Sequence, residues 1–325
     1  MRNRDLVVVG GGPAGMGAAI AAHEHGVKDI LVLERDQYLG GILNQCIHTG
    51  FGIEYFKETL TGPEYADRFI KKIKKIREIE ISLRSFAVRL TKDKIITFIR
   101  PGALEEARAK AIVMATGCRE KTREMVHIAG TRPAGIFSAG LAQKLINIEG
   151  LLPGERVVIV GSGDIGLIMA RRFVLEGAEV KAVIEIQSQT RGLMRNLAQC
   201  VEDFDIPIYF NRKISKIHGK DRVEKVSVVR VDADFNEIRG SETQVECDTV
   251  LISVGLVPEN ELIEMAGVLI DKKTNTPISD GLNKTSIPGL FVCGNSFKVY
   301  DIVDSVSRDS AIAGELAAEY ISGLR

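Results

Sequence analysis

The same pattern of thirty residues occurs twice in this chain. Residues 5–34 read DLVVVGGGPAGMGAAIAAHEHGVKDILVLE, and residues 156–185 read RVVIVGSGDIGLIMARRFVLEGAEVKAVIE. The two copies align without a gap at a constant offset of 151 residues. Each has a β-branched run, the pattern G-x-G-x-x-G, an apolar-periodic stretch and a second β-branched run that ends in Glu. This order predicts strand, helix and parallel strand, so we expect two α/β units.

The spacing of the glycines fits a turn that binds phosphate groups. The first glycine permits a tight turn after the strand, and the second lets the backbone approach a pyrophosphate because it has no Cβ. The third lets the helix pack closely against the sheet. The glycines are Gly10, Gly12 and Gly15 in the first copy and Gly161, Gly163 and Gly166 in the second.

The start of each helix and the final acid complete the predicted site. A helix N-terminus presents free N–H groups and a positive dipole end to the phosphates. A carboxylate 24 residues after the first glycine accepts hydrogen bonds from the adenosine ribose. A lone glycine pattern is weak support, but two full matches in register predict two dinucleotide sites. The residues concerned are Pro13, Ala14 and Glu34 in the first copy and Asp164, Ile165 and Glu185 in the second.

Four further segments accompany the two copies. They are GlyGly at 40–41, AIVMATG at 111–117, VLISVGLVPE at 250–259 and PGLFVCGN at 288–295. With these segments, nearly the whole chain resembles flavoproteins that have two dinucleotide-binding domains. Pyridine nucleotide-disulfide oxidoreductases and thioredoxin reductases belong to that group.

The resemblance implies an α/β fold with two Rossmann-like domains, in which an NAD domain is inserted into an FAD domain. It places the discontinuous FAD domain at 1–117 and 279–325, the NAD(P) domain at 122–250 and a connection back to the FAD domain at 251–278. Beyond the two glycine motifs, it implies cofactor contacts from Arg35, Gly41, Ala115, Thr116, Gly117, Gly255, Gly294, Asn295, Asp304, Ser305 and Val306.

The last of these segments departs from the family. Asn295 stands where the family generally has Asp, and its side-chain oxygen can still accept a bond from a ribityl hydroxyl. The helix that follows is expected to begin near the flavin and to bring Asp304, Ser305 and Val306 close to the pyrimidine end of the ring. Asp304 is equally well explained as a helix N-cap.

The nature of the second nucleotide depends on Glu185. A 2′-phosphate beside a carboxylate meets like-charge repulsion. Relatives that use NADP usually place Arg at or just after this position, whereas here the nearest base, Arg191, lies six residues further on. We therefore expect FAD in the first site and NAD(H), in preference to NADP(H), in the second.

The cysteines do not match those of a disulfide reductase. Five cysteines, at 46, 118, 200, 247 and 293, form no C-x-x-C pair, so neither a disulfide framework nor a metal site is expected. The family's C-x-x-x-x-C beside the flavin is incomplete in GGILNQCIH at 40–48, and AGIFSAGLAQKLIN at 134–147 has no cysteine. Cys46 and His48 are the candidate catalytic residues. For both, simple packing is a competing interpretation.

Composition limits the possible partners and location. Lys and Arg number 43, as do Asp and Glu, so the formal net charge of the 325-residue chain is zero. This gives no support for a nucleic-acid partner. No apolar run of about 18 residues occurs, so no membrane span is expected. The amino-terminal residues are similar to a secretory signal, but their glycine pattern recurs inside the chain, and we expect a cytoplasmic protein.

Two classes of function remain open. The first is an FAD-dependent oxidoreductase that exchanges hydride with NAD(H) and uses an external small-molecule or protein redox partner. The second is a nucleotide-binding subunit without its own substrate site, working with a second flavoprotein or an iron–sulfur protein. GGILNQCIHTGFG and TRPAGIFSAGLAQ resemble segments of sarcosine-oxidase α subunits and of proteins that accompany glycerol-3-phosphate dehydrogenases. The substrate, the direction of electron flow and the oligomeric state are not predicted.

Overall fold

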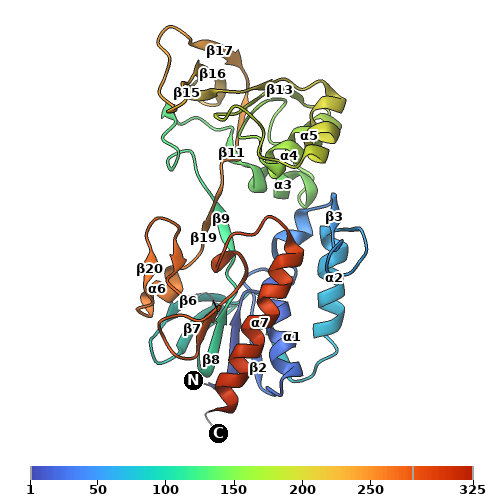
Figure 1. Ribbon diagram of the computed structural model, residues 1–325, viewed down its shortest axis with the longest axis vertical. Helices are drawn as coiled ribbons and strands as arrows, with labels where there is room; N and C mark the ends of the chain where they lie inside the picture. The colour runs from blue at the N-terminus through green and yellow to red at the C-terminus, as the bar shows by residue number, and fades with distance from the viewer. Residues whose placement is uncertain (1, 280–281, 324–325) are drawn as a thin grey trace. The chain divides into compact units, whose positions relative to one another are not determined.

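The computed structural model describes residues 2–279 and 282–323 and consists of two compact units (Figure 1). Unit 1 comprises Met1–Arg119 and Val257–Arg325, and unit 2 comprises Glu120–Leu256. The expected FAD-domain ranges include residues 1, 280–281 and 324–325, which lie outside the described residues. The segment 251–278, expected as a connection, is divided between the units. The functional domain boundaries stay a prediction.

Unit 1 is built on a mixed sheet whose central strands are parallel. Its order is β5-β2-β1-β8-β7-β6, with β22 pairing with β8. Leu6 lies opposite both Ile30 and Ala111, so the apolar run of the first strand is buried between its two neighbours. The strands are β1 (Arg2–Val9), β2 (Ile30–Leu33), β5 (Ile79–Ser82), β6 (Phe86–Leu90), β7 (Ile95–Arg100), β8 (Ala103–Met114) and β22 (Leu290–Val292).

Helices cover one face of this sheet. In Figure 1, the blue helix α1 lies beside the red helix α7, and Gly17 and Ser310 meet where they touch. α1 is made almost wholly of small and apolar residues because it is buried between the sheet and its neighbours. The helices of unit 1 are α1 (Pro13–Glu24), η1 (Gly41–Gln45), α2 (Gly62–Ile73), α6 (Glu261–Met265), η3 (Gly294–Ser296) and α7 (Val303–Ser322). Short strands are β3 (Thr49–Phe51), β4 (Leu60–Thr61), β20 (Ile270–Asp271) and β21 (Thr276–Pro277).

Unit 2 repeats the arrangement on a smaller scale. Its parallel sheet has the order β11-β18-β12-β13-β14, and a second sheet has the order β10-β15-β16-β17. The parallel strands are β11 (Ile136–Ser138), β12 (Arg156–Val160), β13 (Glu179–Ile184), β14 (Ile208–Tyr209) and β18 (Thr249–Ile252). The second sheet holds β10 (Ala129–Gly130), β15 (Arg212–Gly219), β16 (Val223–Arg230) and β17 (Thr243–Glu246). The helices are α3 (Ala139–Asn147), α4 (Asp164–Leu175), α5 (Met194–Cys200) and η2 (Glu202–Phe204).

The two predicted strand–helix–strand copies are present in register. The first is β1, α1 and β2, and the second is β12, α4 and β13. Both pairs of strands are parallel. The prediction of an α/β fold with two Rossmann-like units is confirmed. β9 (Cys118–Glu120) and β19 (Leu256–Pro258), which contain the points where the chain passes between the units, pair with each other.

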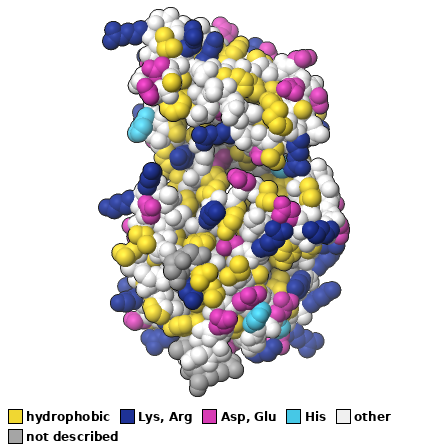
Figure 2. Space-filling view, in the orientation of Figure 1, with side chains coloured by type: hydrophobic (Ala, Val, Ile, Leu, Met, Phe, Trp, Pro, Cys, Tyr) yellow, Lys and Arg dark blue, Asp and Glu magenta, His cyan; other side chains and the backbone are white. Residues whose placement is uncertain are grey.

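The surface agrees with the balanced composition. On the face shown in Figure 2, basic and acidic side chains are interspersed. Among the described residues, the helices are too short or too polar for any of them to cross a membrane.

A buried carboxylate on α7 fixes the turn that follows β22. Asp309 Oδ2 accepts the backbone N–H of Gly294 at 2.7 Å, and Oδ1 accepts the side-chain amide of Asn283 at 2.8 Å. Asn283 also donates to Val292 O at 2.9 Å. Asp309 is 8% exposed, so these bonds are shielded from water.

We predict that Asp309→Ala lowers the free energy of unfolding by about 2–4 kcal/mol, because two buried donors lose their acceptor. The measurement is urea unfolding of the purified protein. Ser322→Ala, at an exposed position on the same helix, is the control and is expected to change stability by less than about 0.5 kcal/mol. Equal stability of the two variants would contradict the assigned role of Asp309.

Candidate dinucleotide-binding sites

The first glycine turn lies at the carboxyl end of β1. Gly10 has φ +112°, and a Cβ there would collide with the backbone carbonyl of Ala115. The turn leads directly into α1, which has Pro13 in its first turn. Proline suits this position because the N–H that it lacks has no partner within a helix. The free backbone N–H groups in the first turn of α1 point out of its N-terminal end, which is where a helix can bind an anion.

Glu34 ties the end of β2 to this turn. Its Oε2 accepts the backbone N–H of Gly11 at 2.7 Å, and its Oε1 accepts that of Asp36 at 2.7 Å. The side chain is 5% exposed. Each carboxylate oxygen keeps capacity for a further bond, as the predicted ribose contact requires.

The chain then returns across the turn. Gly40 donates its N–H to Gly11 O at 2.9 Å. A Cβ on Gly41 would lie 3.1 Å from the Cα of Gly12, so the two backbones are nearly in contact. The pair of glycines at 40–41 therefore passes next to the glycine turn, and a contact from Gly41 to the cofactor stays a prediction.

The second turn repeats this geometry. Gly161 has φ +96°, and a Cβ there would collide with the carbonyl of Ser253 at the end of β18. Glu185 Oε2 accepts both the N–H of Ser162 at 2.9 Å and its hydroxyl at 2.6 Å. Oε1 accepts the N–H of Gln187 at 2.8 Å. Glu185 is 4% exposed, and its backbone partners stand 151 residues after those of Glu34.

Both turns leave room for a ligand at the second glycine. A Cβ on Gly12 would meet nothing nearer than 3.9 Å, and one on Gly163 would meet no described atom within 4 Å. The third glycines are crowded instead, since a Cβ on Gly15 or Gly166 would collide with the carbonyl of Gly10 or Gly161. The residues present therefore fit a dinucleotide in each unit, with the backbone open where the pyrophosphate is expected.

Other predicted residues follow β2 and β8 in unit 1 or precede β19 in unit 2. Thr116, after β8, donates its hydroxyl to Glu259 O at 2.6 Å, and Glu259 donates its N–H to Gly117 O at 3.0 Å. Arg35 is exposed, with a guanidinium nitrogen 3.9 Å from a carboxylate oxygen of Glu259. Gly255, immediately before β19, has φ +120°. Their roles in cofactor binding stay predictions.

The late turn after β22 packs against the starts of α1 and α7. A Cβ on Gly294 would lie 2.7 Å from the Cβ of Ala14 and 3.4 Å from Val306. Asn295 Oδ1 accepts the N–H of Tyr300 at 3.1 Å, and its amide nitrogen lies 3.5 Å from the sulfur of Cys118. Gly294, Ala14 and Val306 thus lie together at one edge of the sheet. The side-chain amide of Asn295 contacts Tyr300 and Cys118.

Asp304 is buried in the first turn of α7, and the interpretation of Asp304 as the N-cap is wrong because Ile302 occupies that position. It is 3% exposed, and its Oδ2 accepts the backbone N–H of Glu54 at 3.3 Å. Ser305, beside it, is half-buried. Tyr65 on α2 lies close by, and burial, together with the Asp304 carboxylate, raises the pKa of its hydroxyl. A contact from Asp304 to the flavin stays a prediction.

Cys46 and His48 have different environments. Cys46 follows η1, is 8% exposed and donates its thiol to Ile42 O at 3.3 Å. Burial raises the pKa of the Cys46 thiol to about 12. His48 is half-buried, with Nδ1 3.1 Å from Thr49 O and its ring centroid 5.0 Å from that of Phe51. The structure favours packing for Cys46, whereas the half-buried ring of His48 is only partly accessible to solvent.

Sequence reasoning missed two side chains that build the sites. Ser162 fills the middle position of G-x-G in the second copy, where the first copy has Gly11. This difference between the copies is a signal that could have pointed to the bond from the Ser162 hydroxyl to Glu185. Asp309 lies 15 residues after Gly294, and nothing in the sequence marks it as the acceptor for that N–H.

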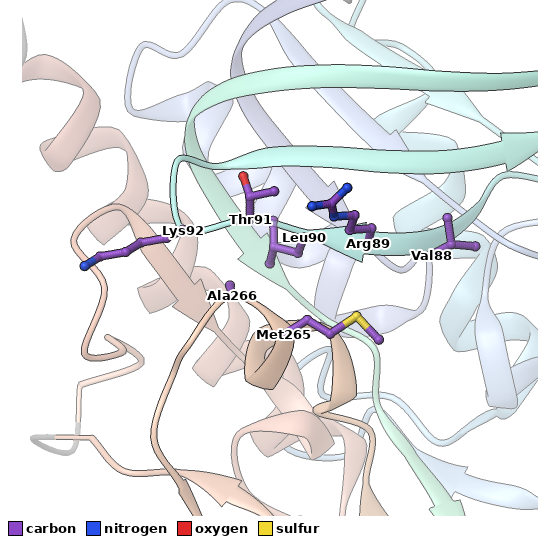
Figure 3. A pocket seen from close by; sticks show the side chains of 7 residues that line it. All are labelled: Val88, Arg89, Leu90, Thr91, Lys92, Met265 and Ala266. Atoms are coloured by element: carbon purple, nitrogen blue, oxygen red, sulfur yellow. The ribbon is translucent and has the colours of Figure 1, made fainter.

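A surface hollow of about 470 Å³ lies elsewhere in unit 1, between β6 and α6 (Figure 3). Its walls come from residues 88–92 and from Met265 and Ala266. None of the predicted site residues lines it. The hollow is therefore separate from the glycine turn.

The fold and the two matched turns define a protein with two Rossmann-type dinucleotide-binding units. The sequence matches the pyridine nucleotide-disulphide oxidoreductase family over residues 4–308, and the chain belongs to that family. Members of this family bind FAD and a nicotinamide nucleotide, in agreement with the predicted pair of cofactors.

The relatives are distant. The chain is 23% identical to an opine oxidase subunit of Agrobacterium tumefaciens (strain Ach5), covering 97% of this chain and 64% of the relative. It is 28% identical to an NADH dehydrogenase of Bacillus subtilis (strain 168), covering 90% of this chain and 53% of the relative. The chain thus spans less than two thirds of the length of these proteins. The crystal structure of T. acidophilum thioredoxin reductase aligns over the whole of both chains, with TM-score 0.78 and 22% identity, and shows the shared fold.

We predict that Gly161→Ala destabilises the protein by at least about 2 kcal/mol more than Gly177→Ala does. Both glycines have positive φ, +96° and +87°, but no described atom lies within 4 Å of the Cβ position of Gly177. The control therefore carries only the conformational cost of Ala, about 1–2 kcal/mol, whereas Gly161→Ala adds a collision with backbone. Urea unfolding measures both, and equal losses would contradict the close approach of Gly161 to Ser253.

Proposed function

We propose that this chain is an FAD-dependent oxidoreductase that exchanges hydride between NAD(H) and FAD. The flavin passes electrons to, or receives them from, an external partner. The observation that carries the proposal is the pair of matched turns, each held by a buried glutamate, in a member of this family. FAD, once bound, supplies the two-electron chemistry, and the protein supplies its binding and orientation.

The proposal assigns FAD to the first turn and NAD(H) to the second. Glu34 and Glu185 are positioned to accept the adenosine ribose hydroxyls, with the pyrophosphates at the starts of α1 and α4. In this assignment, unit 1 holds the discontinuous FAD domain, and unit 2 holds the NAD domain.

The preference for NAD(H) rests on Glu185. Its carboxylate is held in place by three donors, two from Ser162 and one from Gln187, so it cannot easily turn away from the ribose position. A 2′-phosphate would meet this fixed negative charge.

An external electron partner is proposed because the thiols are poorly suited to an internal relay. All five cysteines lie among the described residues, and each keeps its thiol rather than forming a disulfide. Burial raises the pKa of both Cys46 and Cys247 to about 12 and raises that of Cys293 as well, so these sulfurs stay protonated near neutral pH. We also propose a cytoplasmic location, a compartment in which cysteines generally stay reduced.

A second candidate function is membership of a larger amine- or polyol-oxidising assembly. It is favoured by the match of nearly the whole chain to a protein that is named as one subunit of an opine oxidase. In this case, a second flavoprotein or an iron–sulfur protein would complete the enzyme. Co-purification of such a protein with the chain from its own cells would favour this alternative.

We predict that NADH added without oxygen removes the visible absorbance of the flavin in the purified protein. The kcat/KM for NADH, followed with a small acceptor, is expected to exceed that for NADPH by about tenfold or more, as one like-charge contact would produce. A flavin that stays oxidised with NADH would refute the catalytic proposal. A preference for NADPH would refute only the nucleotide assignment.

We predict that Cys46→Ser leaves the rate of flavin reduction by NADH within about twofold of the wild-type rate, because a protonated, buried thiol contributes only packing.

Alkylation of Cys46 by iodoacetamide is expected to stay slow from pH 7 to pH 9, since the pKa of its thiol is raised to about 12 and the thiolate is scarce in that range. His48→Gln is the companion variant, because the half-buried imidazole of His48 is the remaining catalytic candidate. Loss of reduction in Cys46→Ser with FAD still bound would assign chemistry to the thiol.

A further inference from the structure

The two glycine turns differ in the residue that opens the helix. Pro13 follows the second glycine in unit 1, and Asp164 follows it in unit 2. Both begin their helices, α1 and α4. Proline carries neither charge nor side-chain acceptor, whereas Asp164 brings a negative charge to the helix end that attracts anions. Two otherwise matched sites thus differ in charge where a pyrophosphate is expected.

Asp164 is bound to the next helix. Its Oδ1 accepts the backbone N–H of Leu193 at 2.8 Å and the side-chain amide of Asn196 at 2.7 Å. Leu193 is the residue that precedes α5. The carboxylate therefore lies between the starts of α4 and α5 and is stabilised by donors from the second.

The segment 190–196 is also fastened to the glycine turn itself. Thr190 donates its hydroxyl to Ser162 O at 2.8 Å, and Gly192 donates its N–H to the same oxygen at 3.0 Å. A Cβ on Gly192 would lie 3.1 Å from Asp164 Oδ1, which shows how closely the segment approaches the carboxylate. Together with the Asp164 bonds, these contacts hold the segment across the start of α4.

Unit 1 has a similar crossing that does not use a carboxylate at the helix start. Gly40 donates to Gly11 O, as Gly192 donates to Ser162 O. The unit 1 segment is held by its own residue Asn44, whose side chain donates to Leu39 O at 2.9 Å. The first residue of α1 therefore brings no charge to the phosphate position, whereas the first residue of α4 brings one.

We infer that Asp164 is an internal anion that latches the segment 190–196 over the second glycine turn and lowers the affinity of unit 2 for its dinucleotide. The pyrophosphate and the carboxylate are both negative and are attracted to the same helix end, so binding must overcome their repulsion and disturb the latch. The inference rests on the proposed function, because it takes the second turn as the NAD(H) site.

The first test is calorimetric titration of the full-length, FAD-loaded protein with NAD⁺. Asp164→Asn removes the charge but keeps an oxygen that can accept from Leu193 and Asn196, and it is expected to bind NAD⁺ about tenfold more tightly. Glu202→Gln removes an exposed carboxylate from the same unit and is expected to leave the affinity unchanged. Unchanged or weaker binding by Asp164→Asn would overturn the inference.

The second test detects the latch without any nucleotide. Arg191 and Arg195 are exposed within the latched segment, so trypsin can report its opening. Asp164→Ala loses both hydrogen bonds, and we expect cleavage after these arginines to become at least about tenfold faster, with little change in Asp164→Asn and Glu202→Gln. Equal cleavage of the original protein and all three variants would overturn the latch.

The two tests separate this inference from the proposed function. If no variant binds NAD⁺, the proposed second site and the affinity effect both fail. If the wild-type protein and Asp164→Asn bind NAD⁺ equally well, the proposed site stands, and the role of Asp164 as a competing anion fails.

Discussion

A buried glutamate that accepts backbone N–H groups from a glycine turn is the contact on which each unit depends. Glu34 joins the end of β2 to Gly11, and Glu185 joins the end of β13 to Ser162. Bonds from N–H to a carboxylate are stronger than neutral ones, and burial strengthens them further. They fix the turn relative to the second strand, so that the positions proposed for the pyrophosphate and the ribose are set by one rigid element before any ligand binds.

The sequence predicted this part well because its determinants are local. Strand, glycine turn, helix and final acid lie within thirty residues, and their spacing alone specifies the βαβ unit. Contacts between distant residues were not predicted. The approach of Asn295 to Cys118, 177 residues away, depends on how the two chain segments of unit 1 meet, and the bond from Asn283 to Asp309 joins a loop to a helix 26 residues further on. The burial of Cys46 was likewise not predicted, because the local sequence of a loop does not determine whether a cysteine in it packs against distant residues.

The fold and the thiols lead to different expectations about chemistry. The architecture is shared with a thioredoxin reductase. Yet burial raises the pKa values of the Cys46, Cys247 and Cys293 thiols, so that at these three residues the thiolate that disulfide exchange requires is scarce near neutral pH. Under the proposed function, the shared scaffold holds two nucleotides while the path of the electrons beyond the flavin differs, so function has to be argued from the side chains at the site.

Under the proposed assignment, the difference between Pro13 and Asp164 matches the different demands on a resident cofactor and a co-substrate. A resident cofactor binds more tightly to a helix N-terminus that has no carboxylate beside it, because every favourable contact slows dissociation of the cofactor. A co-substrate must leave in each catalytic cycle, and binding that is uniformly tight raises no rate once the site is filled. A carboxylate placed at the second helix start weakens the ground-state complex without altering the backbone that positions the nucleotide. One duplicated motif can in this way serve a retained and an exchanged dinucleotide through a single change of charge.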